Sequence, residues 1–196
     1  MLNFRKVRNK MVLEEKYITL KDGRNALLRS PIPDDAETLI NFLRRASTET
    51  DFLLRGADDS VMSIDDERKF IENNRKSENQ LMICCFVEDN GEYRHAGNCG
   101  LGFNSRRKTA HRASIGIAIL KEFWGNGIGT ALMNEADRAA RERGVSQLEL
   151  EFIEGNARAR ALYEKSGFRI VGIHPNAFRM SDGSLANEYL MIKELK

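Results

Sequence analysis

The chain has 196 residues, a mean hydropathy of −0.48 and a formal net charge of +2 at pH 7. This length favours a single domain with a sizeable buried core. No apolar run approaches the roughly 20 residues of a membrane span, so a soluble globular protein is expected. The small net charge argues against a general nucleic-acid-binding surface.

Residues 1–15 are predicted to be an N-terminal extension, which carries the basic residues Arg5, Lys6, Arg8 and Lys10. No apolar segment follows this basic cluster, so a secretion signal is not expected. Residues 16–196 are predicted to form one domain.

The first half of the chain predicts a hairpin followed by two helices. The runs 17–20 and 25–29 flank a Lys-Asp-Gly-Arg sequence, and Asp-Gly between apolar runs favours a β-hairpin. The spacing of Ala36, Leu39 and Ile40 indicates a helix after the proline at 33. Residues 48–61 have no period and are predicted to be a loop. Ser63 and Asp66 resemble a capping box that opens a helix through about residue 74.

The second half predicts three strands, a helix, a strand, a short helix and two strands. The runs 80–87, 95–103 and 111–120 read as an antiparallel meander, and Gly144 marks the end of the helix that follows. The run 148–152 alternates apolar and acidic residues, as a strand does. The order of elements predicts an α/β fold with a central mixed, mostly antiparallel sheet flanked by helices.

The chain contains three cysteines, Cys84, Cys85 and Cys99, without the spacing of a zinc site. Cys84 and Cys85 are adjacent in a predicted strand, so their side chains are expected to face opposite ways. Reduced thiols, a cytoplasmic location and no metal site are expected.

The sequence Trp-Gly-Asn-Gly-Ile-Gly-Thr at 124–130 joins the apolar strand at 115–120 to a helix that starts at Ile128. Glycines permit a sharp turn and a close approach to a ligand, and the N–H groups of a helix start attract anions. The third glycine of a dinucleotide-binding fingerprint is missing, and so is the Gly-Lys-Ser/Thr of a P-loop. The loop therefore predicts a phosphate or pyrophosphate bound by backbone amides, with a turn that binds no ligand as the alternative.

A second segment, Asn-Ala-Arg-Ala-Arg-Ala-Leu-Tyr-Glu-Lys-Ser-Gly-Phe at 156–168, follows the strand at 148–152. Together the two segments resemble the GNAT superfamily of acyl-CoA-dependent N-acyltransferases. That family carries Arg/Gln-x-x-Gly-x-Gly/Ala, then a strand, then Asn-x-x-Ala-x-x-Leu-Tyr-x-x-x-Gly-Phe. The resemblance covers about residues 80–175, and its one departure is Trp124 at the first position, where packing or a lid over the loop is expected.

The resemblance implies a GNAT-like fold and transfer of an acetyl group from acetyl-CoA to a primary amine. The acceptor would belong to a small molecule or a protein, and attack would be direct, in a ternary complex. The resemblance also implies that the strand before the glycine loop splays from the strand at 148–152, leaving a gap for the thioester. The expected cofactor-binding residues are Ile117, Ala118, Ile119, Gly125, Asn126, Gly127, Ile128, Gly129, Thr130, Asn156 and Arg158.

The resemblance also suggests catalytic residues. Tyr163 is expected to give a proton to the departing thiolate. Ser114 lies where many relatives carry a glutamate base, and its hydroxyl is expected to order a water that carries the proton. Glu149, Glu151 and His111 are alternative bases, although the two glutamates also fit the polar side of an alternating strand.

The sequence is also compatible with other interpretations. The chain is also compatible with a non-catalytic acyl-CoA-binding regulatory module, with a covalent route through Cys99, or with nucleic-acid binding through the basic N-terminus. The loop that carries Asp58 and Asp59 is expected either to attract a cationic amine or simply to be solvated. A homodimer is compatible with the sequence.

Overall fold

The computed structural model describes residues 11–56, 59 and 62–195. The basic residues Arg5, Lys6, Arg8 and Lys10, on which the nucleic-acid interpretation depends, lie outside the described residues. The described start of the predicted extension contacts the domain, because Leu13 is buried and its backbone carbonyl accepts a hydrogen bond from Ser30.

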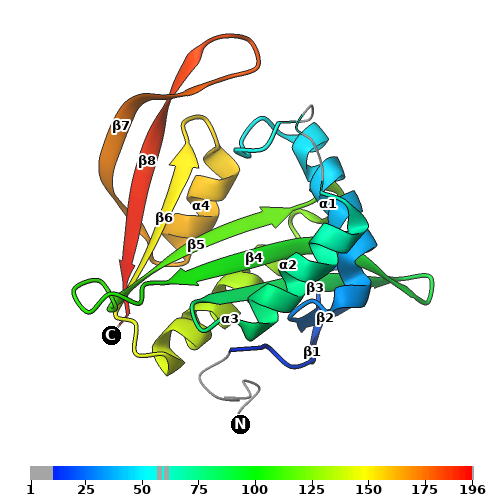
Figure 1. The fold of residues 1–196 in the computed structure, drawn as a ribbon. Helices are drawn as coiled ribbons and strands as arrows, with labels where there is room; N and C mark the ends of the chain where they lie inside the picture. Colours follow the sequence, from blue (N-terminus) through cyan, green and yellow to red (C-terminus); the bar gives the residue numbers. More distant parts are fainter. Residues whose placement is uncertain (1–10, 57–58, 60–61, 196) are drawn as a thin grey trace.

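The described residues form a mixed sheet of eight strands in the order β1-β2-β3-β4-β5-β6-β8-β7 (Figure 1). The strands are β1 (Lys16–Thr19), β2 (Asn25–Arg29), β3 (Gln80–Asp89), β4 (Glu92–Phe103), β5 (Arg112–Ile119), β6 (Gln147–Ile153), β7 (Arg169–Arg179) and β8 (Leu185–Glu194). Only β5 and β6 pair in parallel; the other neighbouring strands pair antiparallel. The predicted mixed, mostly antiparallel sheet is confirmed.

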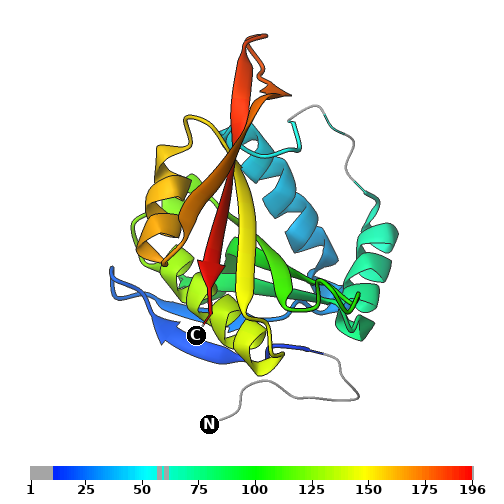
Figure 2. The same cartoon turned by 90° about the vertical axis from the view of Figure 1, so that its left-hand side faces the viewer.

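Helices cover both faces of the sheet. They are α1 (Ala36–Glu49), α2 (Ile64–Lys76), α3 (Ile128–Glu142) and α4 (Ala157–Lys165). Figure 2 shows α1 and α2 on one side of the sheet and α3 and α4 on the other. The loop predicted from residue 48 begins two residues late, because α1 continues to Glu49, where an Arg45–Glu49 ion pair spans its last turn.

Several local sequence signals are confirmed in the structure. Asp22 and Gly23 form the turn between β1 and β2, and the Ser63 hydroxyl accepts a hydrogen bond from the Asp66 N–H at the start of α2. Gly144 follows the end of α3 with a φ of +77°. Cys84 and Cys85 belong to different core clusters on opposite faces of the sheet, and both thiols are free.

The sheet opens between its two parallel strands. β5 and β6 pair at only three positions, Arg112 with Gln147, Ala113 with Leu148 and Ser114 with Glu149. Beyond Ser114 the two strands diverge, while β5 stays paired with β4 and β6 stays paired with β8. The predicted splay is confirmed, and beyond Ser114 and Glu149 it leaves one edge of each strand without a partner strand among the described residues.

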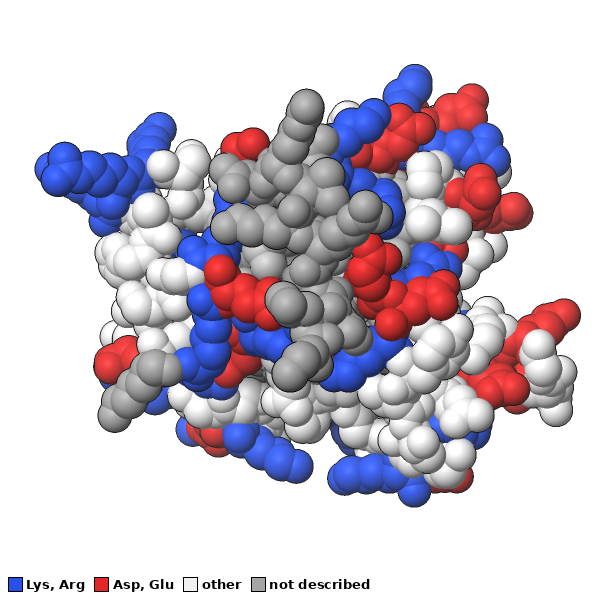
Figure 3. Space-filling view, turned by 90° about the horizontal axis from the view of Figure 1, so that it is seen from below, with Lys and Arg blue, Asp and Glu red and all other residues white. Residues whose placement is uncertain are grey.

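Charged side chains of both signs lie on the lower face of the molecule. On the face seen in Figure 3, basic and acidic side chains are interspersed rather than gathered by sign. In the part of the chain that the structure describes, no helix is long and apolar enough to cross a membrane.

A buried histidine lies under α1. The His95 ring lies between Phe42 and Phe86, with centroid distances of 4.2 Å and 5.1 Å. Its Nε2 is 3.0 Å from the Gly97 carbonyl, to which a protonated Nε2 donates, while Nδ1 has no hydrogen-bond partner among the described residues. Burial lowers the pKa of His95 to about 4.

This histidine predicts a loss of stability in mild acid. The unfolded chain takes up the proton near the ordinary pKa of about 6.5, whereas the folded chain resists it until about pH 4. The free energy of unfolding should therefore fall by up to about 3 kcal/mol as the pH drops from 6.5 to 4. Urea unfolding across this range would measure it. In a His95→Gln variant, the free energy of unfolding should lack this fall between pH 6.5 and 4. An equal fall in the variant and the wild type would contradict the prediction.

Candidate active site

The splayed strands open into a cleft of about 1530 Å³. Its walls come from β5, β6, the end of α1, the loop after α1, the glycine loop and α4. The predicted catalytic residues Ser114 and Tyr163 line this cleft, and so does every residue predicted to bind the cofactor except Asn126. The alternative base His111 does not line it. The cleft therefore brings together segments that are far apart in the sequence.

The glycine loop turns directly into α3. Gly125 and Gly127 have φ values of +83° and +92°, which an L side chain rarely adopts, and Gly127 is the N-cap of the helix. The first N–H groups of α3, at Ile128, Gly129 and Thr130, have no acceptor within the helix. A Cβ on Gly129 would lie 2.9 Å from Leu162, so glycine there lets α3 and α4 pack closely. The loop has the geometry of an anion site built on backbone amides.

A lysine from the β1–β2 hairpin reaches this loop. The Lys21 N–H donates to the Asn126 carbonyl at 3.1 Å, and the Lys21 side chain passes Gly127, with Cγ 3.8 Å from an ideal Cβ there. The Lys21 side chain makes no ion pair in the described part of the chain, and its Cε lies 4.0 Å from an ideal Cβ on Gly127, the N-cap of α3. Sequence reasoning missed this residue, because only the folding of the hairpin onto the loop brings it there.

Trp124 fixes the glycine loop to the end of β5. Its indole Nε1 donates a hydrogen bond to the Ile119 carbonyl at 2.7 Å. The Arg158 guanidinium lies over the indole ring, 4.4 Å from its centroid. The aromatic residue at the first motif position thus satisfies a carbonyl at the splayed edge and holds a cation at the mouth of the cleft.

Helix α4 presents Tyr163 to the cleft. Asn156 caps this helix through its Oδ1, which accepts a hydrogen bond from the Ala159 N–H at 3.1 Å. The Tyr163 ring packs near Phe152 and Phe168, and its hydroxyl has no hydrogen-bond partner among the residues described. Burial, with a smaller contribution from nearby Cys99, raises the pKa of Tyr163 to about 12. Tyr163 is therefore protonated near neutral pH and available as a donor.

Cys99 lies in the core beside Tyr163. It is fully buried and does not line the cleft, and burial raises the pKa of its thiol to about 12. A cysteine nucleophile acts as the thiolate. The surroundings of Cys99 thus do not support the covalent route.

Ser114 and four glutamates, Glu49, Glu149, Glu151 and Glu188, line the cleft. The Glu149 carboxylate accepts hydrogen bonds from Arg112 at 3.1 Å and Gln147 at 2.6 Å, and Glu188 lies 3.5 Å from His174. Glu151, by contrast, has neither a hydrogen bond nor an ion pair within the described residues. Ser114 lies at the last paired position of β5, where its hydroxyl donates to the Gly102 carbonyl at 3.4 Å.

The open end of the cleft is bridged. The Asp51 carboxylate, just after α1, accepts hydrogen bonds from the Ser181 N–H at 3.2 Å and hydroxyl at 2.6 Å. This contact joins the loop after α1 to the β7–β8 hairpin. Of the two aspartates predicted in the loop, Asp58 lies outside the described residues, and Asp59 caps a local turn at Gly56.

The family assignment rests on the whole arrangement and on sequence. The family described as Acetyltransferase (GNAT) family matches residues 46–168, more than half of the chain. The chain belongs to this acetyltransferase family. The predicted resemblance is confirmed, and membership places the chain among acyltransferase enzymes.

Solved GNAT structures share the fold. The acetyltransferase of GNAT family from Streptococcus pneumoniae superimposes with a TM-score of 0.78 at 31% identity, covering 86% of this chain and 99% of that one. The structure of yncA from Salmonella typhimurium with its cofactor acetyl-CoA has a TM-score of 0.71 at 17% identity, covering 88% and 95% of the two chains. At 17% identity, the similarity to yncA shows a shared fold and nothing more.

Curated relatives match shorter segments of the GNAT chain. Mycothiol acetyltransferase of Beutenbergia cavernae is 55% identical over 51 residues, which are 26% of this chain and 17% of that protein. The ribosomal protein bS18-alanine N-acetyltransferase of Haemophilus influenzae is 40% identical over 75 residues, 38% of this chain and 51% of that protein. The matched segments therefore span about half or less of these relatives.

Proposed function

We propose that the chain transfers an acetyl group from acetyl-CoA to a primary amine, by direct attack in a ternary complex. The observation that carries this proposal is the single cleft shared by the glycine loop, the splayed strands and Tyr163. The three cysteines are free and buried, which supports the proposed cytoplasmic location.

The residues present fit acetyl-CoA. The first N–H groups of α3, with Lys21 and Arg158 nearby, would hold the anionic diphosphate. The unpaired edge of β5 at Ile117–Ile119 would take the amides of the pantetheine arm as one more strand, although Trp124 already occupies the Ile119 carbonyl. The cosubstrate supplies an activated acyl group as a thioester.

Glu151 is the proposed proton acceptor. Arg112 and Gln147 hold the Glu149 carboxylate, whereas Glu151 faces the same cleft without a described partner. A free carboxylate can receive the proton that an attacking ammonium must lose. The proposed role of Ser114 is to order a water molecule between the amine and Glu151.

Tyr163 completes the reaction. The amine nitrogen forms a bond to the thioester carbonyl carbon, the carbon–sulfur bond breaks, and the Tyr163 hydroxyl gives its proton to the departing sulfur. The raised pKa of about 12 keeps that proton on Tyr163 until it is needed. The nitrogen then loses its second proton, which returns to the Tyr163 oxygen through solvent, so the products are an acetylated amine and free coenzyme A.

The relatives leave two kinds of acceptor open. Their names give mycothiol and an alanine of a ribosomal protein. The carboxylates of Glu151 and Glu188 would attract either amine as a cation.

A panel of amines, assayed for release of the free thiol of coenzyme A, tests this function. Release with at least one amine is expected. Tight binding of coenzyme A without release for any amine would instead indicate a non-catalytic acyl-CoA-binding module.

Lys21 is expected to contribute to cosubstrate affinity alone. Lys21→Met removes the charge but keeps the side-chain length, so the Kd for coenzyme A should rise about fivefold, as for loss of one screened charge contact of about 1 kcal/mol. Quenching of Trp124, the only tryptophan, would report binding without turnover. Affinity for pantetheine, which lacks phosphates, should not change.

Lys108→Met is the control variant, because Lys108 lies in the β4–β5 loop outside the cleft. Equal increases of the Kd for coenzyme A in the two variants would show that Lys21 does not belong to the binding site.

A further inference from the structure

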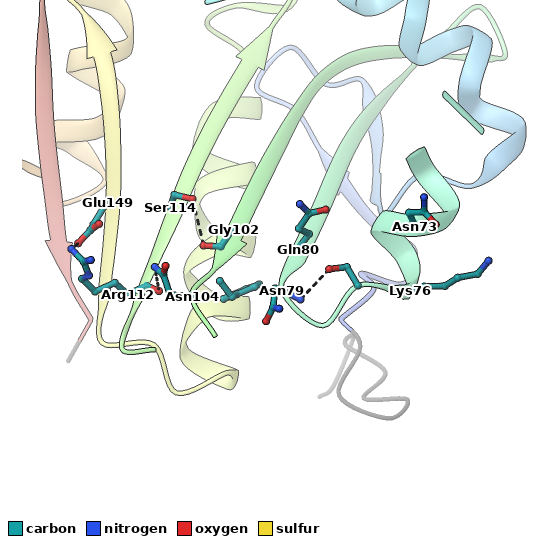
Figure 4. A pocket seen from close by; sticks show the side chains of 11 residues that line it. Asn73, Lys76, Asn79, Gln80, Gly102, Asn104, Arg112, Ser114 and Glu149 are labelled. Atoms are coloured by element: carbon teal, nitrogen blue, oxygen red, sulfur yellow. Dashed lines mark hydrogen bonds and ion pairs between the residues drawn. The ribbon is translucent and has the colours of Figure 1, made fainter. Parts of the chain in front are cut away.

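A second, polar cleft of about 810 Å³ adjoins the first (Figure 4). It lies on the α2 side of the sheet, at the end where β5 and β6 are still paired. Ser114 and Glu149 line both clefts. A molecule that brings an amine to the splayed strands can therefore extend into the polar cleft.

The floor of this polar cleft is a row of residues across four strands. The strand register aligns Gln80, Gly102, Ser114 and Glu149 side by side. Three interstrand spacings cover roughly 14 Å, the length of about four residues of extended peptide. Gly102 leaves this floor open, because a Cβ there would lie 2.7 Å from the Ser114 hydroxyl.

Side-chain amides are the most frequent polar groups in the lining. Four side-chain amides line the cleft, those of Asn73, Asn79, Gln80 and Asn104. Among the described residues, the Asn73 side chain and the Gln80 Nε2 make no hydrogen bond. Arg112 is neutralised by Glu149 at 3.1 Å, and Figure 4 shows Lys76 pointing away from the other labelled residues.

This chemistry suits a peptide backbone. A side-chain amide offers both N–H donors and a carbonyl acceptor, which are the groups that a peptide unit needs. Because Arg112 is paired with Glu149, the cleft has no reason to prefer a ligand with a free carboxylate or a second ammonium group. The length of the row, the glycine in its floor and the side-chain amides all match an extended, uncharged chain.

We propose that the acceptor is the N-terminal amine of an extended peptide, whose first residues lie across Gln80, Gly102 and Ser114. This inference rests on the proposed acetyl transfer and adds a preference for a peptide over a single amino acid or a polyamine. The peptide amine reaches the acetyl carbon where β5 and β6 part, on the side of Glu151.

The test compares kcat/KM for three acceptors: alanine amide, a tetrapeptide amide that begins with alanine, and spermidine. The tetrapeptide should exceed the other two by about tenfold or more, because only it fills the polar cleft. Gln80→Leu should remove most of that advantage and leave turnover of alanine amide unchanged. Asn134→Leu, an exposed amide on α3 across the sheet, is the matched control and should change neither value.

Equal kcat/KM for the three acceptors, a preference for spermidine, or equal losses for both substrates in Gln80→Leu would overturn the inference. Calorimetric binding of the N-acetylated tetrapeptide, with coenzyme A present, tests it without turnover. The expected result is binding that weakens at least about fivefold in Gln80→Leu. No binding to the wild type overturns the peptide site, whereas binding without thiol release from any amine supports the site and contradicts the proposed acetyl transfer.

Discussion

Replacing Tyr163 with phenylalanine is expected to lower kcat by about a hundredfold to a thousandfold and to leave the Kd for acetyl-CoA within about twofold. Loss of a positioned general acid typically costs a factor in this range. The ring itself packs beside Phe152 and Phe168, so phenylalanine keeps those contacts and removes only the hydroxyl. The thiolate must then leave without a proton from the protein.

Steady-state kinetics together with Trp124 quenching would separate the two parameters. Tyr189→Phe is a matched control, because the Tyr189 ring also stacks against Phe152 and its hydroxyl donates to Glu154 outside the cleft. This control should keep kcat within about twofold of the wild type. Full turnover in Tyr163→Phe would exclude Tyr163 as the acid. Since the pKa of Tyr163 is about 12, its ionisation should not lower the rate between pH 7 and 10.

Replacing Glu151 with glutamine is expected to lower kcat/KM about a hundredfold at neutral pH. The amide keeps the shape of the side chain but accepts no proton, so only the minor neutral form of the amine can react. The deficit should shrink as the pH rises, because more of the amine is then already neutral. A pH profile of kcat/KM for the wild type and Glu151→Gln measures this convergence.

Glu149→Gln is the comparison that locates the base. Its carboxylate already accepts hydrogen bonds from Arg112 and Gln147, so its replacement should disturb the lining of the cleft more than the proton transfer. The expected loss is about tenfold or less, with no convergence at high pH. A larger, pH-dependent loss in Glu149→Gln than in Glu151→Gln would assign the base to Glu149.

The parts of the site that the sequence predicted are those with local requirements. The glycine loop is predictable from the sequence because the positive φ values at Gly125 and Gly127 favour glycine there. The cap at Asn156 is readable for the same reason, since an amide oxygen at a helix start satisfies a neighbouring N–H. These requirements involve only a few neighbouring residues, so they can be recognised in the sequence without knowledge of the fold.

The rest depends on contacts between distant segments. Lys21 lies beside the glycine loop only because the β1–β2 hairpin packs there. Alternation placed Glu151 on the polar side of its strand, but only the splay shows that this side faces a cleft rather than open solvent. Trp124 was visible as a departure from the motif, whereas its partners, the Ile119 carbonyl and Arg158, emerge from the folded chain.

The short pairing of β5 with β6, at three positions, also separates the sheet into two hydrogen-bonded parts. The first five strands form one continuous hydrogen-bonded unit and the last three form another, joined by Arg112–Ser114 and Gln147–Glu149. A change in twist on either side of so short a seam would widen or narrow the gap without breaking a hydrogen bond within either unit. The same seam lets substitutions in β7 and β8 reshape one half of the molecule while the glycine loop on the other half keeps its geometry.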